Sequence, residues 1–373
     1  MRIAVLTYST RPRGSVVHTL ALAEALAELG ESVTVYALER GDGEGLFRAV
    51  TPEVNVEVVP VRRSEDLEER VLRSIAALSA AVDVEAYDIV HAQDCIGANA
   101  VPGCVRTVHH LDHFTSPALV RCHDRAIVGP RSHVCVSKGV AAELRAGWDI
   151  DARVIPNGVH AGRFEAAAGP DGAEDRATWR RQLGHGPLVL TVGGIEPRKG
   201  SIELLEAVAR LRKRRPDARL VVAGGETLFD YRDYRAVFDQ RAAELGVDVE
   251  VLGPVEHDAL PALVACADVF ALPSVKEGFG LAAMEALAAG VAVVLRDGPV
   301  LREVFDGAAL FGETSRDLGD RLLAALGEPA AGRRERGRAL AASHTWEAAA
   351  RAHLDFYRGL SSRVAPVAMA TAE

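Results

Sequence analysis

Several common patterns are missing from this 373-residue sequence. Its five cysteines are odd in number and form no C-x-x-C pair, which argues against a disulfide framework or a zinc site and favours a reducing compartment. No apolar run reaches the roughly 18 residues that a membrane-spanning helix needs. The apolar start, MRIAVLTYST, is too short for a signal peptide. We therefore expect a cytoplasmic protein.

A basic excess is missing as well. The formal net charge is −9, which argues against a nucleic-acid partner, so local groups must hold any bound anion. The apolar fraction of 49% and the charged fraction of 25% are typical of a folded globular protein. Because a domain usually has roughly 100–200 residues, the length predicts two domains.

Short runs of Val, Ile and Leu alternate with amphipathic stretches along most of the chain, a pattern typical of βαβ units and parallel sheets. The first series of strand candidates is RIAVLTY, SVTVYAL, VNVEVVPV, YDIVHAQ, VRTVHH, SHVCVS and RVIPNG. A stretch rich in Gly, Ala and charge then predicts a linker near residues 160–186. The second series is LVLTVGG, RLVVAGG, VEVLGPV, DVFALPS and VAVVLRD. Two doubly wound sheets with a cleft between them are expected, and the cleft is the default site.

The stretch TVGGIEPRKG follows the first strand of the second series. Gly193 and Gly194 permit a close approach of the backbone to a ligand. Arg198 and Lys199 stand just before the next helix, where cations oppose the helix dipole unless an anion joins them. A guanidinium beside an ammonium suits a diphosphate, so a phosphate site is favoured over a solvated basic pair.

The stretch PSVKEGFGLAAMEALAAG carries two glutamates, Glu277 in a turn and Glu285 on the following helix. Glycines beside Phe279 leave backbone N–H groups open to phosphate or sugar oxygens. Each glutamate alone could be an ordinary turn or helix residue. Together with the two cations, they describe a nucleotide-diphosphate-sugar pocket, in which the predicted donor-binding residues of this stretch are Glu277, Gly278, Phe279, Gly280, Leu281 and Glu285.

Two further clusters have alternative readings. VHHLDHF holds His109, His110 and His113 beside Asp112, but the spacing matches no closed metal site, so we predict no metal and a hydrogen-bonding His109. The basic run LRKRRPDAR could touch anionic lipid, which keeps a peripheral membrane contact open. A basic helix C-terminus is the simpler explanation of that run.

Four motifs, in the same order, resemble those of the retaining glycosyltransferases of family GT4 (glycosyl transferases group 1), whose fold is called GT-B. EGFGLAAMEA is similar to the family's E-x7-E signature, and GGIEPRKG to its donor-phosphate motif. VIPNGV resembles the last strand of its first domain, and HTWEAAA the start of its final crossover helix. The similarity spans nearly the whole chain.

The resemblance implies an α/β fold of GT-B type, in which two Rossmann-like doubly wound domains face a cleft and a C-terminal helix crosses back to the first domain. It implies an acceptor-binding domain at residues 1–160 with about 345–365, and a nucleotide-sugar domain at residues 161–344. Residues 366–373 are expected to form a flexible tail.

The implied activity is that of a hexosyltransferase, which moves a sugar from a nucleotide-diphosphate-sugar to an acceptor hydroxyl with retention of configuration. No metal or other cofactor is implied. By resemblance, Arg198 and Lys199 bind the donor diphosphate and Glu285 the ribose hydroxyls. Glu277 holds the transferred sugar, and His109 lies near that sugar and the acceptor. The residues expected to act in catalysis are therefore His109, Glu277, Arg198 and Lys199.

The sequence also departs from the family's pattern. The first loop, where a Gly-Gly pair is usual, reads Arg13-Gly14-Ser15 and brings an extra positive side chain near the acceptor or the diphosphate. AGGET replaces a frequent turn, so the base-reading edge is expected to be atypical.

Three other functions stay open. A GT-B-shaped nucleotide-sugar 2-epimerase would convert the donor without an acceptor, and a non-catalytic nucleotide-sugar-binding protein would turn nothing over. A dinucleotide oxidoreductase is disfavoured because TYSTRPRGSVVH lacks the G-x-G-x-x-G fingerprint. The sequence names neither the sugar, the base, the acceptor nor the oligomeric state.

Overall fold

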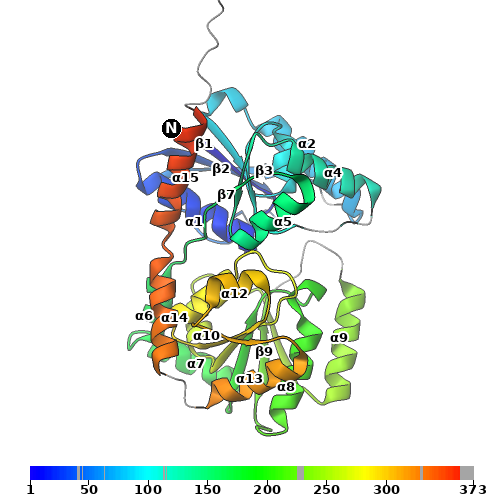
Figure 1. The fold of residues 1–373 in the computed structure, drawn as a ribbon, viewed down its shortest axis with the longest axis vertical. Coiled ribbons are helices and arrows are strands. Elements are labelled where there is room, and N and C mark those ends of the chain that lie inside the picture. The colour runs from blue at the N-terminus through cyan, green and yellow to red at the C-terminus, as the bar shows by residue number, and fades with distance from the viewer. Residues whose placement is uncertain are drawn as a thin grey trace, which may run out of the picture.

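The computed structural model describes residues 1–39, 43, 45–62, 64–111, 114, 116–224, 231–327 and 331–361. Within them lie two parallel β-sheets, one in each half of the chain, with helices between most successive strands (Figure 1). In this described part no helix is both long and apolar enough to cross a lipid bilayer.

The first sheet has seven strands in the order β3-β2-β1-β4-β5-β6-β7, and all its neighbouring strands are parallel. Its strands are β1 (Arg2–Thr7), β2 (Ser32–Glu39), β3 (Val54–Pro60), β4 (Ile89–Ala92), β5 (Val105–Val108), β6 (Ser132–Cys135) and β7 (Arg153–Val154). The strand order reverses at β1 and β4, as in a doubly wound sheet, where ligands bind beyond the carboxyl ends of the strands.

The second sheet has six strands in the order β10-β9-β8-β11-β12-β13, again all parallel. Its strands are β8 (Leu188–Val192), β9 (Arg219–Ala223), β10 (Val249–Gly253), β11 (Val269–Leu272), β12 (Ala292–Arg296) and β13 (Leu310–Gly312). Its reversal point lies between β8 and β11, so both halves present the same kind of strand edge to a ligand.

The helices of the first half are α1 (Gly14–Glu28), α2 (Leu67–Ala81), the short η1 (Val84–Ala86), α3 (Cys95–Ala100), α4 (Pro117–Val128) and α5 (Lys138–Trp148). Those of the second half are α6 (Ala161–Ala168), α7 (Ala173–Leu183), the short η2 (Pro197–Lys199), α8 (Ser201–Arg212), α9 (Arg232–Leu245), α10 (Leu260–Ala265), α11 (Leu281–Ala288), α12 (Pro299–Phe305), α13 (Ser315–Leu326) and α14 (Ala331–Ser343). The chain ends in α15 (Trp346–Ser361).

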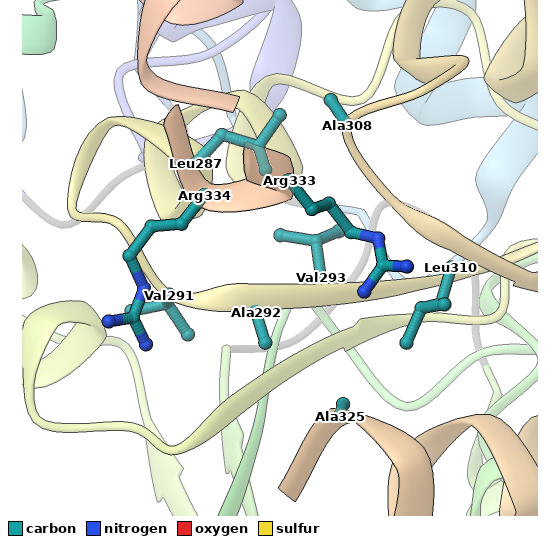
Figure 2. A pocket seen from close by; sticks show the side chains of 9 residues that line it. All are labelled: Leu287, Val291, Ala292, Val293, Ala308, Leu310, Ala325, Arg333 and Arg334. Carbon is teal, nitrogen blue, oxygen red and sulfur yellow. The ribbon is translucent and has the colours of Figure 1, made fainter. Parts of the chain in front are cut away.

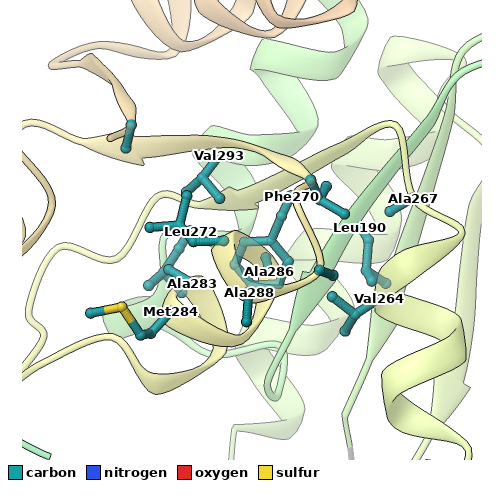
Figure 3. Packing of buried hydrophobic residues seen from close by; sticks show 14 of the residues in the cluster. Leu190, Val264, Ala267, Phe270, Leu272, Ala283, Met284, Ala286, Ala288 and Val293 are labelled. Carbon is teal, nitrogen blue, oxygen red and sulfur yellow. The ribbon is translucent and has the colours of Figure 1, made fainter. Parts of the chain in front are cut away.

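Each sheet is covered by an apolar cluster on both faces, because successive strand residues point to opposite sides. In β1, Ile3 and Val5 join one cluster, and Ala4 and Leu6 the other. In the second half, Phe270 and Leu272 of β11 pack against Met284 and Ala286 of α11 (Figure 3). This packing fixes α11, which carries the predicted site residues Leu281 and Glu285, on the second sheet.

The C-terminal helix returns to the first half, as the resemblance implies. Helix α15 packs on α1, and its buried Trp346, Leu354 and Tyr357 belong to the same cluster as Ile3 and Val5 of β1 (Figure 1). Val159, at the end of the first half, donates its N–H to the carbonyl oxygen of His344 at 2.8 Å. The predicted crossover is therefore confirmed.

The strand predictions hold, and two features differ. The structure adds β13, whose three residues are too few to give a visible pattern. The expected linker near residues 160–186 instead forms α6 and α7, which dock through Phe164 and Leu183 into the core of the second half. Alanine favours helix strongly, and tertiary docking stabilises helices whose own apolar stripe is narrow. The predicted tail at 366–373 lies outside the described residues.

Candidate functional site

The predicted phosphate stretch lies beyond the carboxyl end of β8, at the reversal point of the second sheet. Gly193, with φ of 141°, donates its N–H to Ala223 at the end of β9, and Gly194 follows it. Arg198 and Lys199 lie in η2, the single turn that precedes α8. Gly200 ends that turn with φ of 65°, a conformation that favours glycine, and α8 begins directly after it.

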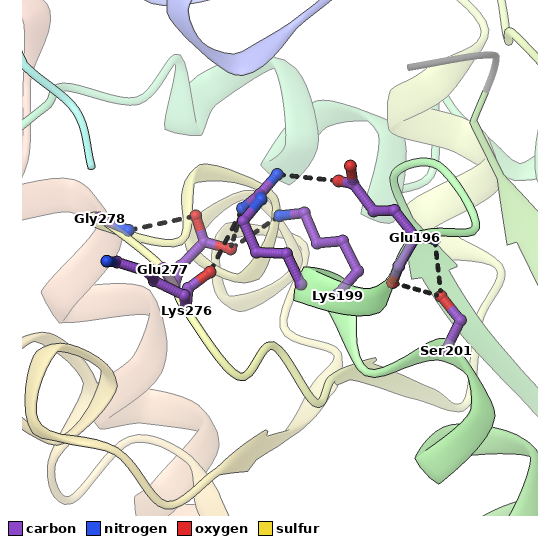
Figure 4. A network of polar contacts seen from close by, with 7 residues as sticks. Glu196, Lys199, Ser201, Lys276, Glu277 and Gly278 are labelled. Carbon is purple, nitrogen blue, oxygen red and sulfur yellow. Dashed lines mark hydrogen bonds and ion pairs between the residues drawn. The ribbon is translucent and has the colours of Figure 1, made fainter. Parts of the chain in front are cut away.

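The second predicted stretch lies beyond the neighbouring strand, β11, and is joined to the first by ion pairs. Lys199 Nζ donates to Glu277 Oε2 at 2.7 Å, and Arg198 Nη1 lies 3.9 Å from the same oxygen (Figure 4). Burial opposes ionisation of Glu277, but Lys199 and Arg198 outweigh it and lower the pKa of the carboxyl to about 2. The structure therefore brings Glu277, held as a carboxylate, to the neighbouring Arg198 and Lys199, from which it is distant in sequence.

Arg198 has a second acidic partner, which the sequence analysis does not identify. Glu196 Oε1 accepts a hydrogen bond from Arg198 Nη2 at 2.8 Å, and Glu196 is only 7% exposed. Its position two residues before the arginine is the one signal in the sequence that could have indicated this pair.

The glycines around Phe279 bring the two halves of the molecule into contact. A Cβ atom on Gly278 would lie 1.7 Å from the carbonyl oxygen of His109, so only glycine fits there. Phe279 is 3% exposed and packs against the His344 ring, so any ligand contact of Phe279 would come from its backbone. After Gly280, α11 begins at Leu281 with no side-chain cap, which leaves its first N–H groups for a ligand.

Glu285 lies one turn into α11 and is partly buried. Burial raises the pKa of its carboxyl to about 7, and the Arg163 guanidinium offsets this only in part. The two glutamates thus differ in protonation near neutral pH, with Glu277 fully ionised and Glu285 about half protonated.

In the first half, His109 follows β5 and hydrogen-bonds through Nε2 to Oε1 of the buried Gln93 at 3.2 Å. Burial, with the neighbouring His110 and Arg106, lowers the pKa of His109 to about 3, so its ring is neutral. The ring of His18 from α1 meets it edge to face, with 4.7 Å between the centroids. The sequence analysis does not predict His18 or Gln93, because nothing in their local patterns links them to residue 109.

The first loop leads directly into α1. Arg13 is the N-cap residue, Gly14 and Ser15 begin the helix, and no side chain caps it. A Cβ atom on Gly14 would meet nothing within 4 Å, so the structure imposes no need for glycine at this position. The carbonyl oxygen of Ser15 accepts a hydrogen bond from Thr19 Oγ1 at 2.7 Å.

Other contacts also join the two halves beside the site. Glu303 of α12 accepts hydrogen bonds from the backbone N–H groups of Lys138 and Gly139, at 2.8 and 2.9 Å, at the start of α5. Lys276 pairs with Glu143 at 3.4 Å. The predicted donor residues of the second half therefore lie against the His109 edge of the first.

A metal site and an apolar hollow are two other candidates for ligand binding. Among the described residues no group of three or more His, Cys, Asp or Glu side chains could hold a metal ion. Asp112 and His113 of the stretch VHHLDHF lie outside the described residues. Residues 225–227 of the stretch AGGET lie outside them as well. A hollow between α11, α13, α14 and β12 is lined mainly by apolar side chains, with Arg333 and Arg334 beside it (Figure 2). None of the predicted site residues lines this hollow.

Solved structures share the fold of this protein. The sucrose-phosphate synthase from Thermosynechococcus elongatus is similar with a TM-score of 0.77 and 22% identity, over 97% of this chain and 100% of that one. HepE from Anabaena, in complex with UDP and glucose, gives a TM-score of 0.74 and 21% identity, over 97% and 100%. The architecture is the two-domain α/β fold of GT-B glycosyltransferases.

Sequence comparison shows the family. Residues 175–333 match the model of glycosyl transferases group 1, and residues 12–163 match that of glycosyltransferase family 4. A D-inositol 3-phosphate glycosyltransferase from Xylanimonas cellulosilytica is 30% identical over an alignment of 417 residues that covers 97% of each chain. The chain belongs to glycosyltransferase family 4 and is an enzyme of glycosyltransferase type.

Proposed function

We propose that this enzyme transfers a sugar from a nucleoside-diphosphate-sugar to an acceptor hydroxyl with retention of anomeric configuration. The observation that carries the proposal is the pairing of Lys199 with Glu277 beside Arg198. Two cations at the start of α8 suit the diphosphate, and a carboxylate held 2.7 Å from one of them suits the hydroxyls of the attached sugar. The second half, residues 161–344, binds the donor in this proposal, and the first half binds the acceptor.

During transfer, the bond between the anomeric carbon and the diphosphate oxygen breaks, and a bond to the acceptor oxygen forms on the same face. Negative charge develops on the departing diphosphate, where Arg198, Lys199 and the first N–H groups of α11 stabilise it. The acceptor hydroxyl passes its proton to the departing diphosphate, so the step needs no metal ion and no protein base. Retention rests on the family resemblance alone.

Two carboxylates have separate roles in the proposal. Glu277, ionised by Lys199 and Arg198, accepts hydrogen bonds from hydroxyls of the transferred sugar. Glu285 accepts hydrogen bonds from the ribose hydroxyls, and its ionised form, in which both oxygens accept, does so best.

His109 acts as a neutral hydrogen-bonding group beside the sugar. Its low pKa excludes an imidazolium at neutral pH, so it contributes no positive charge toward the diphosphate. Gln93 Oε1 accepts the hydrogen of Nε2, which leaves Nδ1 as the acceptor of the ring.

The relatives guide the choice of substrates to test. The HepE structure contains UDP and glucose, so UDP-glucose is the first donor to try. The relative from Xylanimonas cellulosilytica is named for D-inositol 3-phosphate, which makes phosphorylated polyols the first acceptors. Arg13 of the first loop supplies a cation near the start of α1 that suits such an anionic acceptor.

Thermal unfolding with UDP, GDP, ADP, NAD and the common nucleotide-sugars tests the proposal. A ligand at about 100 times its dissociation constant should stabilise the folded state by roughly 2.7 kcal/mol, which raises the midpoint by a few degrees. Arg198→Ala should weaken binding of the stabilising diphosphate about 10- to 100-fold, because charge-assisted hydrogen bonds are lost. Arg235→Ala removes an exposed arginine of α9 and should bind as the wild type does.

Four results would contradict the proposal. Stabilisation by NAD alone would contradict the assignment of the donor site. Equal diphosphate binding in Arg198→Ala and the wild type would contradict it as well. Product formed from the donor without any acceptor would favour the epimerase, and donor binding without turnover on any acceptor would favour a non-catalytic binding protein.

A further inference from the structure

An acidic side chain lies inside the cation site of the proposed donor pocket. Glu196, 7% exposed, forms an ion pair with Arg198 although the diphosphate that Arg198 is proposed to bind is itself an anion. A negative charge at that position weakens the attraction of the site for phosphate. The Glu196–Arg198 pair must therefore contribute something that offsets this loss. Lys199 differs in this respect, because its partner Glu277 is itself proposed to bind the donor.

The two ends of the Arg198 guanidinium have different partners. Nη2 donates to Glu196 Oε1 at 2.8 Å, and Nη1 donates to the carbonyl oxygen of Lys276 at 3.3 Å (Figure 4). The plane of the guanidinium is therefore fixed by groups on both sides. A guanidinium has five N–H donors, so it can keep both partners and still bind phosphate oxygens.

The backbone that carries Glu196 is fixed as well. Its N–H group donates to Ser201 Oγ at 3.3 Å, and Ser201 Oγ donates back to the Glu196 carbonyl oxygen at 3.4 Å. The carbonyl oxygen of Arg198 accepts from the N–H of Val275 at 2.8 Å. Glu196 thus stands on a closed turn between β8 and α8, which is tied to the loop after β11.

We propose that Glu196 is a positioning residue, which holds the Arg198 guanidinium in the orientation that binds the donor diphosphate. An arginine side chain has many rotamers, and an arginine that is already ordered loses less entropy when a ligand binds. The gain in order outweighs the repulsion between the Glu196 carboxylate and the phosphates. This inference rests on the proposed function, since it assigns a ligand to Arg198.

Two substitutions of Glu196 test the length of its side chain and its negative charge separately. Glu196→Gln keeps the length of the side chain and an oxygen that accepts from Arg198, but it removes the negative charge. Glu196→Asp keeps the charge, but it is one methylene too short to make the 2.8 Å bond without a shift of the backbone. Glu206→Gln is the matched control, because Glu206 also accepts from an arginine, Arg241, at 2.8 Å, on the helix surface of the same half.

The measurement is the dissociation constant, by titration calorimetry, of whichever of UDP, GDP or ADP stabilises the wild type. The matching nucleoside, which lacks both phosphates, is measured by competition. Glu196→Asp should weaken diphosphate binding about tenfold and leave nucleoside binding within about twofold. Glu196→Gln should bind the diphosphate as tightly as the wild type or more tightly.

The outcomes distinguish this inference from the proposed function. Suppose that Arg198→Ala loses affinity for the diphosphate. If Glu196→Asp then keeps its affinity, or if Glu196→Gln loses as much affinity as Glu196→Asp, Glu196 does not position Arg198. The proposed donor site is unaffected by either result. If both Glu196 variants weaken nucleoside and diphosphate equally, the role is structural and the inference fails. If Arg198→Ala keeps full affinity, the proposed function fails and the inference fails with it.

Discussion

The carboxyl edges of the two sheets occupy equivalent places in the two halves, yet they carry opposite kinds of titratable group. The first-half edge and the helices over it hold a group of histidines, namely His18, His91 and His353, which are buried, and His109, which is partly buried. The second-half edge holds the ion pairs of Glu196, Arg198, Lys199 and Glu277. The histidines of the first half are therefore neutral, and the paired side chains of the second half are charged.

The neutral state of the histidines follows from their surroundings. Burial lowers the pKa of His353 to about 4 and, with the neighbouring histidines, holds the pKa of His18 and His91 well below the usual range. His91 hydrogen-bonds to Tyr357 at 2.5 Å and to Thr107 at 2.8 Å, so it is satisfied without a charge. Helix α15 thus docks on the first half through aromatic rings and neutral hydrogen bonds.

The difference between the charged edge and the histidine edge indicates how each half suits its proposed role in the reaction. Charged groups remain in a partly buried site only when they are paired, and the second half keeps its cations available by pairing each with a carboxylate. At the histidine edge of the first half, neutral rings pack closely instead, which costs little desolvation. In the proposed function, the charged edge binds the diphosphate and the neutral edge lies beside the sugar and acceptor.

The largest effect is expected on the charged edge. Lys199→Met should lower kcat about 10²- to 10³-fold, because it removes a cation that stabilises the departing diphosphate and also deprives Glu277 of its nearest partner. Steady-state kinetics with the identified donor measures this. Lys213→Met, on the exposed end of α8, should keep kcat within about twofold, and an equal loss there would contradict a specific role for Lys199.

The second largest effect is expected from a substitution at Gly278, where the two edges are in contact. Gly278→Ala should lower kcat about 100-fold, since the new methyl would lie 1.7 Å from the His109 carbonyl oxygen and must push the edges apart. Gly162→Ala, whose methyl meets nothing within 4 Å, is the control and should leave kcat unchanged. Full activity of Gly278→Ala would show that the reaction does not need the edges in contact.

The neutral edge should be sensitive to acid. A histidine with a lowered folded-state pKa binds fewer protons than in the unfolded chain, so its stabilising contribution is complete above about pH 6.5 and is lost as pH falls toward its folded-state value. Within that window the free energy of unfolding should drop by up to about 1.4 kcal/mol per pH unit for each such histidine. For His353 the window ends near pH 4.

Comparison of variants isolates the contribution of His353 to the pH dependence of the unfolding free energy, because the other titrating groups are common to all of them. Between pH 6.5 and 4.5, His353→Leu should show a shallower fall in unfolding free energy than the wild type, as measured by chemical denaturation. Exposed His185 offers the control His185→Gln, which should match the wild-type slope. Equal slopes in all three proteins would mean that His353 is not a neutral buried group.

The smallest effect concerns the second glutamate of the charged side. If ribose hydroxyls bind ionised Glu285, whose pKa is about 7, binding releases a proton and strengthens with pH, by roughly tenfold between pH 6 and pH 8. A nucleotide-sugar is the right probe, since its phosphates do not titrate in that range. Glu285→Gln should bind weakly with no such pH dependence. The same dependence in the variant would assign the proton to another group.

Much of the architecture could be predicted from the sequence. Runs of β-branched residues between amphipathic stretches identified both parallel sheets, and the glycines of GGIEPRKG and EGFG marked the two loops that meet at the site. The stretch at 160–186 could not be assigned in this way, because α6 and α7 are helical through docking rather than through a strong apolar stripe. The domain boundaries, the absence of a metal requirement and the cytoplasmic location remain predictions.

The sequence by itself determined the order along the chain of the strands and helices other than α6, α7 and β13, and the residue types of the donor stretch, because these depend on local pattern and turn chemistry. Only the tertiary structure decided which groups meet. It joined Lys199 to Glu277 across 78 positions, placed Gln93 and His18 against His109, and returned His353 to the first half on α15. Protonation followed from that packing, since burial and neighbouring charges set each pKa, and gave two glutamates of one motif pKa values of about 2 and about 7.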